Sequence, residues 1–428
     1  MSNLIVTGGF PISGEVTPVG NKNAILPLIC AATLTDEPVT FHNVPSSSSV
    51  RVLLKIYRKL GGKVAYVGKN SIRLTGKGID NHVIDKELSK KERSALMFLG
   101  PLLHRFGKAE VDEAGGCKLG NRPVDTLFQG LIAMGGIMDK DNIYKFTTKG
   151  LKGNPNIYQI EASVTGTESL VLTAVLARGT TIIHNAACEP HVQDVCNFLN
   201  SIGAKIEGVG SNKLVITGVE KLNGGEWKII SDHIDVAGLI MVGAITGGRL
   251  KINNAIPEHM YQVLNYLKKL NINVHIDGDS IIVPENQELI AKPNLKGDID
   301  KIYDAPHPMG VPMDLIPQFV VTAALAKGTI KVHSFFYETQ LLSLYEELLK
   351  MRANIQLTDT KTIMTFGPSR LKGASINASS IISSAYAELM AALVADGASV
   401  IKNADIISRR YPDIVPTLNS LGAKIEVD

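Results

Sequence analysis

Two helical patterns alternate along the chain. The charged residues of "VRVLLKIYRKLGG" lie outside one helical stripe, which consists of Val52, Leu53, Ile56, Tyr57 and Leu60. This spacing predicts an amphipathic helix with one face against a core. The segments "ESLVLTAVLARG", "AGLIMVGAITGG", "IPQFVVTAALAKG" and "AYAELMAALVADG" are apolar nearly all round. They predict buried helices, each ended by its glycine.

A longer pattern recurs around these helices. It runs strand, polar turn, amphipathic helix, strand, turn, strand, and it begins near residues 37, 107, 179, 248, 328 and 397. Runs such as "SIRLTG" and "KLVITG" have the β-branched content and terminal glycine of strands. Recurrence of one supersecondary unit indicates a repeat architecture. Six copies predict an α/β protein of two three-unit domains, with the apolar helices wrapped by sheets.

The N-terminal run "NLIVTG" resembles the strands that close each unit. We expect it to pair with "AKIEV" of the last unit, which places both chain ends in one domain. The predicted domains are therefore residues 1–21 plus 231–428, a discontinuous three-repeat domain, and residues 22–230, an inserted three-repeat domain that carries the Cys117 loop.

The composition is that of an ordinary globular protein, with 428 residues, 45% hydrophobic residues and a net charge of +3. Charges of both signs are interspersed, so we expect no nucleic-acid partner. The N-terminus lacks the pattern of a signal peptide, and no apolar run is long enough to cross a membrane. The four cysteines do not form a disulfide framework. We therefore expect a cytoplasmic monomer without a membrane partner, in which Cys117 is a free thiol.

The segment "GGCKLGNRPVD" carries the most concentrated chemistry. It places Cys117 between Lys118 and Arg122 on a glycine-rich loop ahead of a predicted helix. Neighbouring cations stabilise a thiolate, and the start of a helix attracts an anion. We interpret the segment as an activated thiol beside a phosphate site. The alternative is a surface turn with an incidental cysteine.

Other polar residues stand just ahead of apolar helices. Lys22, in "GNKNAILPL", is either a solvated cation or one that an anion joins at the helix start. Asp314, in "DAPHPMGVPMDLIPQF", is either an N-cap or a base that removes a proton from a substrate hydroxyl. Arg93, in "KKERSALMFLGP", also stands just ahead of a buried helix, and the alternative to a functional role is a surface charge. No metal-spaced His/Cys cluster and no dinucleotide or P-loop signature occurs, so we expect no metal and no cofactor.

Together these segments resemble the UDP-N-acetylglucosamine enolpyruvyl transferase (1-carboxyvinyltransferase) family. The resemblance covers nearly the whole chain and rests on "GNKNAILPL", "RSALMFLGPLLHRFG", "GGCKLGNRPVD", "GTTIIHNAACEP" and "APHP…PMD…PQF". It implies an inside-out α/β barrel built from six βαβαββ repeats. It also implies a cytoplasmic enzyme of peptidoglycan and hence cell-wall synthesis. That transferase moves the carboxyvinyl group of phosphoenolpyruvate to a hydroxyl of UDP-N-acetylglucosamine and releases phosphate.

The resemblance also implies roles for individual residues. Lys22 and Arg122 would hold the phosphate of phosphoenolpyruvate. Cys117 would be the general acid and could form a covalent adduct, and Asp314 would be the base toward the acceptor hydroxyl. The remaining substrate-binding positions would be Asn23 toward the acceptor, Arg93 beside the ligands, and Pro123, Val124, Asp125, Ser163 and Val164 toward the nucleotide.

The chain departs from the family pattern at several ligand positions. Gln340 and Ser383 stand where the family has arginines of its phosphoenolpyruvate-binding set. Five further positions differ on the nucleotide side. Glu161 stands in place of a family lysine, Cys188 and His233 in place of arginines, His191 in place of an acidic residue, and Leu127 in place of a histidine. Each lost buried cation weakens binding of a doubly charged ligand.

Two alternatives therefore stay open beside the housekeeping reaction. One is a divergent paralogue that performs the same transfer onto another nucleotide or sugar in a specialised pathway. The other is a non-catalytic relative that binds a nucleotide sugar. The loss of arginine at positions 340 and 383 favours the second alternative, and the intact Cys117 segment speaks against it.

Overall fold

The computed structural model describes residues 2–112, 124–140, 143–336 and 339–428. Their contacts divide them into two compact units. The terminal unit contains residues 2–18 and 231–428, and the middle unit contains the described residues from 19 to 230.

The middle unit has three sheets, with strand orders β13-β3-β5-β4, β6-β8-β7 and β11-β12-β10-β9. The strands are β3 (Val39–His42), β4 (Lys63–Gly68), β5 (Ser71–Thr75), β6 (Lys108–Val111), β7 (Ile137–Lys140), β8 (Tyr144–Thr147), β9 (Ile157–Tyr158), β10 (Thr180–His184), β11 (Lys205–Glu207), β12 (Lys213–Thr217) and β13 (Gly225–Lys228).

The terminal unit has three further sheets, with strand orders β21-β22-β1-β23, β15-β16-β14-β2 and β17-β18-β20-β19. Their strands are β1 (Leu4–Thr7), β2 (Gly14–Val16), β14 (Leu250–Ile252), β15 (His275–Asp277), β16 (Ser280–Val283), β17 (Lys301–Tyr303), β18 (Gly328–His333), β19 (Ile355–Asp359), β20 (Thr362–Gly367), β21 (Ser375–Asn377), β22 (Ala398–Lys402) and β23 (Lys424–Val427).

The sheets share one plan. In five of them an edge strand runs parallel to its neighbour: β13 to β3, β9 to β10, β2 to β14, β17 to β18 and β21 to β22. The other strands pair antiparallel. In the sheet of β6, the parallel bridge Val83↔Glu110 takes the place of the parallel edge strand. Six sheets of similar plan confirm the six predicted repeats.

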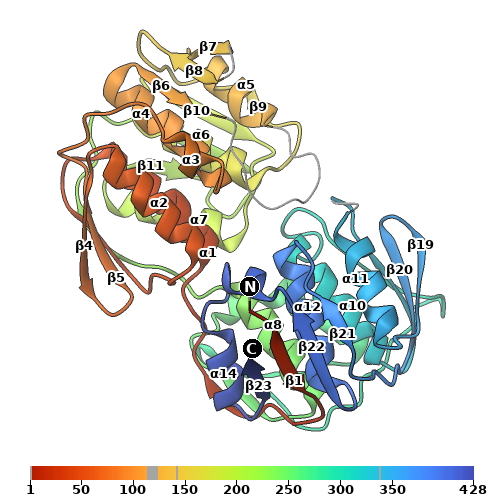
Figure 1. Cartoon of the computed structure of the whole chain (residues 1–428). Coiled ribbons are helices and arrows are strands. Elements are labelled where there is room, and N and C mark those ends of the chain that lie inside the picture. The colour runs from red at the N-terminus through yellow and green to blue at the C-terminus, as the bar shows by residue number, and fades with distance from the viewer. Residues whose placement is uncertain (1, 113–123, 141–142, 337–338) are drawn as a thin grey trace. The chain divides into compact units, whose positions relative to one another are not determined.

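Strand β1 joins the two ends of the chain. It pairs antiparallel with β22 on one side and with β23 on the other, in the register Leu4↔Ile401 and Leu4↔Val427. Both termini therefore lie in the same sheet of the terminal unit (Figure 1). The predicted pairing of "NLIVTG" with "AKIEV" is confirmed.

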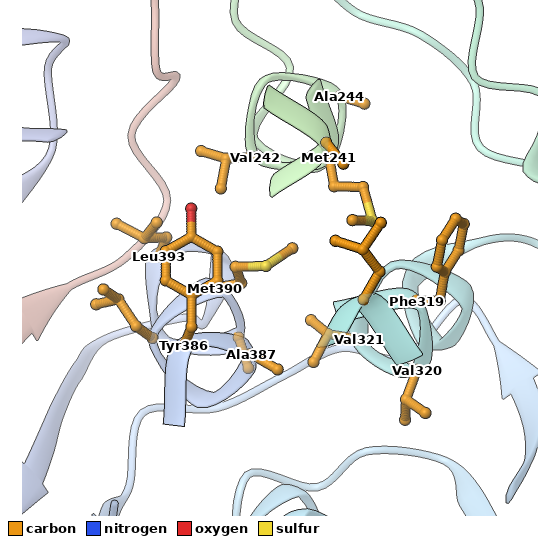
Figure 2. Close-up of a cluster of buried hydrophobic side chains, with 14 of the residues drawn as sticks. Met241, Val242, Ala244, Phe319, Val320, Val321, Tyr386, Ala387, Met390 and Leu393 are labelled. Carbon is orange, nitrogen blue, oxygen red and sulfur yellow. The ribbon is translucent and has the colours of Figure 1, made fainter. Parts of the chain in front are cut away.

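Helices that are buried on nearly all sides form the centre of each unit. In the terminal unit they are α8 (His233–Thr246), α10 (Ile316–Leu325) and α12 (Ile382–Val394), which contact one another. Figure 2 shows Met241, Val321 and Met390 from these helices in one apolar cluster. In the middle unit they are α1 (Lys22–Ala31), the 3₁₀ helix η2 (Arg93–Phe98) with α4 (Leu99–Phe106), and α6 (Val164–Ala174).

The remaining helices are α2 (Ser48–Lys59), α3 (Lys86–Ser89), α5 (Asp125–Ala133), α7 (Pro190–Ser201), α9 (Tyr261–Leu267), α11 (Thr339–Lys350), α13 (Asp405–Ser408) and α14 (Ile414–Ser420), with short 3₁₀ turns η1 (Ala32–Leu34), η3 (Pro257–His259), η4 (Lys268–Leu270) and η5 (Met313–Leu315). Most of the stripe predicted around α2 is confirmed: Leu53, Ile56, Tyr57 and Leu60 are buried, whereas Arg51, Lys55 and Arg58 are exposed. Val52 of the predicted stripe is only partly buried, and Leu54, which lay outside it, is buried.

The expectation that a glycine ends each buried helix is correct at only one of four places. Helix α8 ends at Thr246, and Gly247 caps it with a left-handed backbone at φ 72°. Helices α6, α10 and α12 end before their glycines, with caps at Val175, Ala326 and Ala395. The positive φ of Gly179, Gly328 and Gly397 serves the turn into the next strand instead.

Gly100→Ala tests the close approach of α4 to α6. A Cβ at position 100 would lie 2.1 Å from Thr173 Oγ1 and 3.2 Å from Thr173 Cα, so a helix has to move. Overpacking of this kind costs about 1–3 kcal/mol. We expect a lower midpoint of urea-induced unfolding, followed by circular dichroism.

The matched control is Gly68→Ala. Its new Cβ would meet Ser71 Cβ at 3.6 Å, which is ordinary van der Waals contact. Equal midpoints for the two variants would contradict the proposed steric conflict at Gly100.

Candidate active site

The start of α1 carries Lys22 and Asn23, which are both partly exposed. Asn21 caps this helix: its Oδ1 accepts hydrogen bonds from Asn23 N at 2.8 Å and from Ala24 N at 3.1 Å. A helix N-terminus has partial positive charge, which is unfavourable for a lysine by itself and favourable for an anion. The local geometry therefore suits an anion that meets both the helix start and Lys22.

Arg93 opens η2, which leads directly into α4. Glu92 lies before it, and its Oε1 accepts a hydrogen bond from Ser94 Oγ at 3.2 Å. The 3₁₀ helix η2 contacts both α1 and α6. Arg93 thus begins the second of three neighbouring buried helical segments, as Lys22 begins the first.

The starts of α5 and α6 lie side by side. Ser163 caps α6 through a bond from Gly166 N to its Oγ at 3.2 Å. A Cβ at Gly166 would be 3.2 Å from Thr126 Cγ2, so the two helix starts approach each other closely here. Asp125 precedes Thr126, and Val164 follows Ser163. The structure therefore brings the predicted nucleotide-facing residues of these two helices into one neighbourhood.

The thiol segment falls outside the described residues. Cys117, Arg122 and Pro123 belong to residues 113–123, and their predicted roles stay predictions. The described chain resumes at Val124, and Asp125 is the first residue of α5 and is exposed.

In the terminal unit, Asp314 lies in η5 at the entrance to α10, with its side chain 29% exposed. It does not cap the helix. Its Oδ2 accepts a hydrogen bond from Arg410 Nη1 at 3.0 Å. Arg410 Nη2 also donates to both oxygens of Asp232, at 2.9 and 2.8 Å. Burial alone would lower the pKa of Arg410, but the charge of Asp232, with lesser effects of Tyr411 and Asp314, raises it.

Arg410 and Asp232 were not predicted from the sequence. Both are almost fully buried, at 7% and 1% exposure. Asp232 is also the N-cap of α8, because its Oδ1 accepts a bond from Ile234 N at 3.0 Å. An aspartate directly before an apolar helix was the one local signal, and it predicts a cap rather than an ion pair.

Gln340 and Ser383, at positions where the resemblance implies arginines, contact each other. Gln340 Nε2 donates to Ser383 Oγ at 3.0 Å and to the carbonyl oxygen of Met313 at 3.0 Å. Ser384 Oγ donates to the carbonyl oxygen of Gln340 at 3.0 Å. Neutral hydrogen bonds therefore connect α11 and α12 to the residue before Asp314.

The substitutions on the nucleotide side differ in exposure. Glu161 is exposed, whereas Leu127, Cys188, His191 and His233 are buried. Leu127 belongs to the apolar core of the middle unit, and burial raises the pKa of the Cys188 thiol to about 11. His233 is the first residue of α8 in the terminal unit. Of these five residues, Glu161 is the one that places a charged side chain at the surface.

His307 precedes Asp314 on the proline-rich loop. Burial and the neighbouring His259 lower the pKa of His307, which favours its neutral imidazole. Across the described ranges, no cluster of His, Cys, Asp or Glu could hold a metal ion. Among those same residues, no helix is long and apolar enough to cross a membrane.

The whole chain is similar to known carboxyvinyltransferases. The family model for EPSP synthase (3-phosphoshikimate 1-carboxyvinyltransferase) matches residues 6–418. Proteins named UDP-N-acetylglucosamine 1-carboxyvinyltransferase from Borreliella burgdorferi and Treponema denticola are 41% and 40% identical to it over 427 residues, which is 100% of this chain and 99% of each relative. One of the same name from Bradyrhizobium diazoefficiens is 38% identical over 422 residues, 99% of this chain and 97% of the relative.

Solved structures show the same architecture. The enolpyruvyl transferase NikO from Streptomyces tendae superposes with a TM-score of 0.86 at 21% identity, covering 100% of this chain and 98% of that one. EPSP synthase from Acinetobacter baumannii does so with a TM-score of 0.76 at 18% identity, covering 100% of both chains. The fold is therefore that of the enolpyruvyl transferases. The chain belongs to the EPSP synthase (3-phosphoshikimate 1-carboxyvinyltransferase) family and is a transferase, which confirms the resemblance found in the sequence.

Alkylation distinguishes Cys117 from the other thiols. Burial raises the pKa of Cys188 to about 11, that of Cys196 to about 12 and that of Cys30 well above its usual range. Iodoacetamide reacts with the thiolate. We therefore expect a single label on the native chain at pH 7.5, and none on Cys117→Ser, in intact-mass spectra.

Unfolded Cys117→Ser in urea is the control, and it should take up a label on each remaining cysteine. A label on Cys30, Cys188 or Cys196 of the native protein would contradict the burial of these thiols.

Proposed function

We propose that this transferase moves the carboxyvinyl group of phosphoenolpyruvate to a hydroxyl of UDP-N-acetylglucosamine and releases phosphate. The full-length relatives that carry this activity in their names support the proposal. The observation that carries it is the position of the candidate ligand residues at helix starts. Lys22, Arg93, Asp125 and Val164 are each the first residue of a helical element. Both proposed substrates contain phosphate, the group that helix N-termini bind.

The reaction is an addition followed by an elimination. The acceptor oxygen forms a bond to C2 of phosphoenolpyruvate, its proton goes to a base, and C3 takes a proton from an acid. The resulting tetrahedral intermediate then loses phosphate from C2 and a proton from C3. The enzyme therefore needs a base, an acid and cations for the phosphate.

The middle unit would supply the groups that bind phosphate and nucleotide. Lys22 at the capped start of α1, with Arg122, would hold the phosphate of phosphoenolpyruvate. Asn23 would contact the acceptor or the intermediate, and Arg93 would add positive charge. The adjoining starts of α5 and α6 would face the nucleotide through Pro123, Val124, Asp125, Ser163 and Val164.

The proposed general acid is Cys117 and the proposed general base is Asp314. Cys117 would give the proton to C3, as the thiol that neighbouring cations activate. Asp314 would receive the hydroxyl proton, and its partial exposure supports this role because a base must reach its substrate.

Because positions 340 and 383 lack arginines, phosphoenolpyruvate would be bound by other residues. Gln340 and Ser383 are buried, neutral and bonded to each other. The remaining cations of the proposed set are Lys22, Arg93 and Arg122. A cytoplasmic location and a monomeric chain stay predictions from the sequence.

Phosphate release tests the proposal. Wild-type protein with phosphoenolpyruvate and UDP-N-acetylglucosamine should release phosphate, measured in a coupled assay beside a panel of other nucleotides and UDP-sugars. Asp314→Asn should lower kcat by about 10²- to 10⁴-fold, the usual contribution of a positioned acid or base. Binding of UDP-N-acetylglucosamine, measured by calorimetry, should persist.

Glu285→Gln, an exposed acid-to-amide change in the same unit, is the control and should match the wild type. Release with another acceptor only would replace the proposed substrate. No release with any acceptor, despite nucleotide binding, would refute the enzymatic proposal.

A further inference from the structure

Arg410 occupies an unusual place beside the proposed base. Its guanidinium lies between two carboxylates, with Nη1 3.0 Å from Asp314 Oδ2 and Nη2 2.8 Å from Asp232 Oδ2. Its side chain is 8% exposed, and that of Asp232 is 2% exposed. The Tyr411 ring lies under the guanidinium, with 5.6 Å from Cζ to the ring centroid. The arginine is thus held on several sides.

Arg410 is poorly suited to replace the missing arginines as a ligand contact. Both of its terminal nitrogens already donate to carboxylates, and its side chain is buried. Its geometry fits a different task, which is to fix the orientation of Asp314.

The charges support this task. Asp232 binds Arg410 through both oxygens and also caps α8, so it largely balances the charge of the guanidinium. Asp314 then receives a directed hydrogen bond while the group of three keeps a net negative charge. Within the described part of the chain, no hydrogen bond reaches the Oδ1 atom of Asp314, which leaves that oxygen to accept a proton.

The backbone at Asp314 is held separately. Gln340 donates to the carbonyl oxygen of Met313, and Ser383 accepts a second hydrogen bond from the same amide. The two residues that replaced arginines therefore support the turn that carries the carboxylate, while Arg410 orients the carboxylate itself.

We propose that Arg410 is a positioning residue of the transfer reaction: anchored by Asp232, it holds Oδ2 of Asp314 so that Oδ1 faces the acceptor hydroxyl. This inference rests on the proposed function. Arg410 contacts no substrate in this account and acts only through Asp314.

A double-mutant cycle tests it. The variants are Arg410→Lys, Asp314→Asn and the pair, and kcat is measured from phosphate release. A displaced base costs about 100-fold, so Arg410→Lys should lower kcat by about that factor with little change in KM for either substrate. In the Asp314→Asn background the same change should have no further effect on kcat. Multiplicative losses, or an unchanged kcat in Arg410→Lys, would overturn the proposal.

Two further variants serve as a control and as a replacement for Arg410→Lys. Arg370→Lys, an exposed arginine of the same unit, should leave kcat unchanged. If thermal unfolding shows that Arg410→Lys does not fold, Asp232→Asn takes its place, because asparagine keeps the helix cap but not the charge. Its loss of kcat must likewise disappear in the Asp314→Asn background, and persistence there overturns the proposal. Wild-type release with UDP-N-acetylglucosamine tests the proposed function alone, and the cycle uses whichever acceptor supports release.

Discussion

Helices that are apolar on every side impose the main constraint on this structure. In the terminal unit, α8, α10 and α12 contact one another and also strands of their own sheets, so almost none of their surface is left for water. One repeat supplies one such helix and one sheet, and it cannot bury that helix alone. Three repeats can do so together, which explains why the sheets and buried helical segments of each unit come in threes.

The burial of these helices also determines where charged functional side chains can lie. A helix buried along its length reaches polar surroundings only at its ends, where backbone N–H groups have no partner within the helix. Lys22 and Arg93 stand at such ends, and so does Asp314 at the entrance to α10. Arg410 instead carries a charge into the interior. Removing one partner from a buried ion pair costs about 3–5 kcal/mol, so Arg410 and Asp232 depend strongly on each other.

Local patterns of apolar residues were sufficient to predict the buried helices. Comparison of the recurring units with one another predicted the repeats and the pairing of β1. Helix ends were harder, because α10 and α12 end before the glycines that were expected to end them. The positions of Lys22 and Arg93 at helix starts also follow from local sequence. Arg410 does not: Arg409 and Arg410 look alike in the sequence, and the partners that bury Arg410 lie 178 and 96 residues away. The contact of Gln340 with Ser383 spans 43 residues and is equally invisible to local patterns.

The pairing of β1 with β22 and β23 determines which unit can fold first during translation. Until residues 398–427 leave the ribosome, both edges of β1 lack their strands. Every sheet of the middle unit, in contrast, pairs only strands that precede residue 229. Domains fold as units during translation. The middle unit can therefore be folded while both edges of β1 (Leu4–Thr7) are still unpaired. Unpaired strand edges promote aggregation. Dependence on chaperones should accordingly concentrate in the terminal unit.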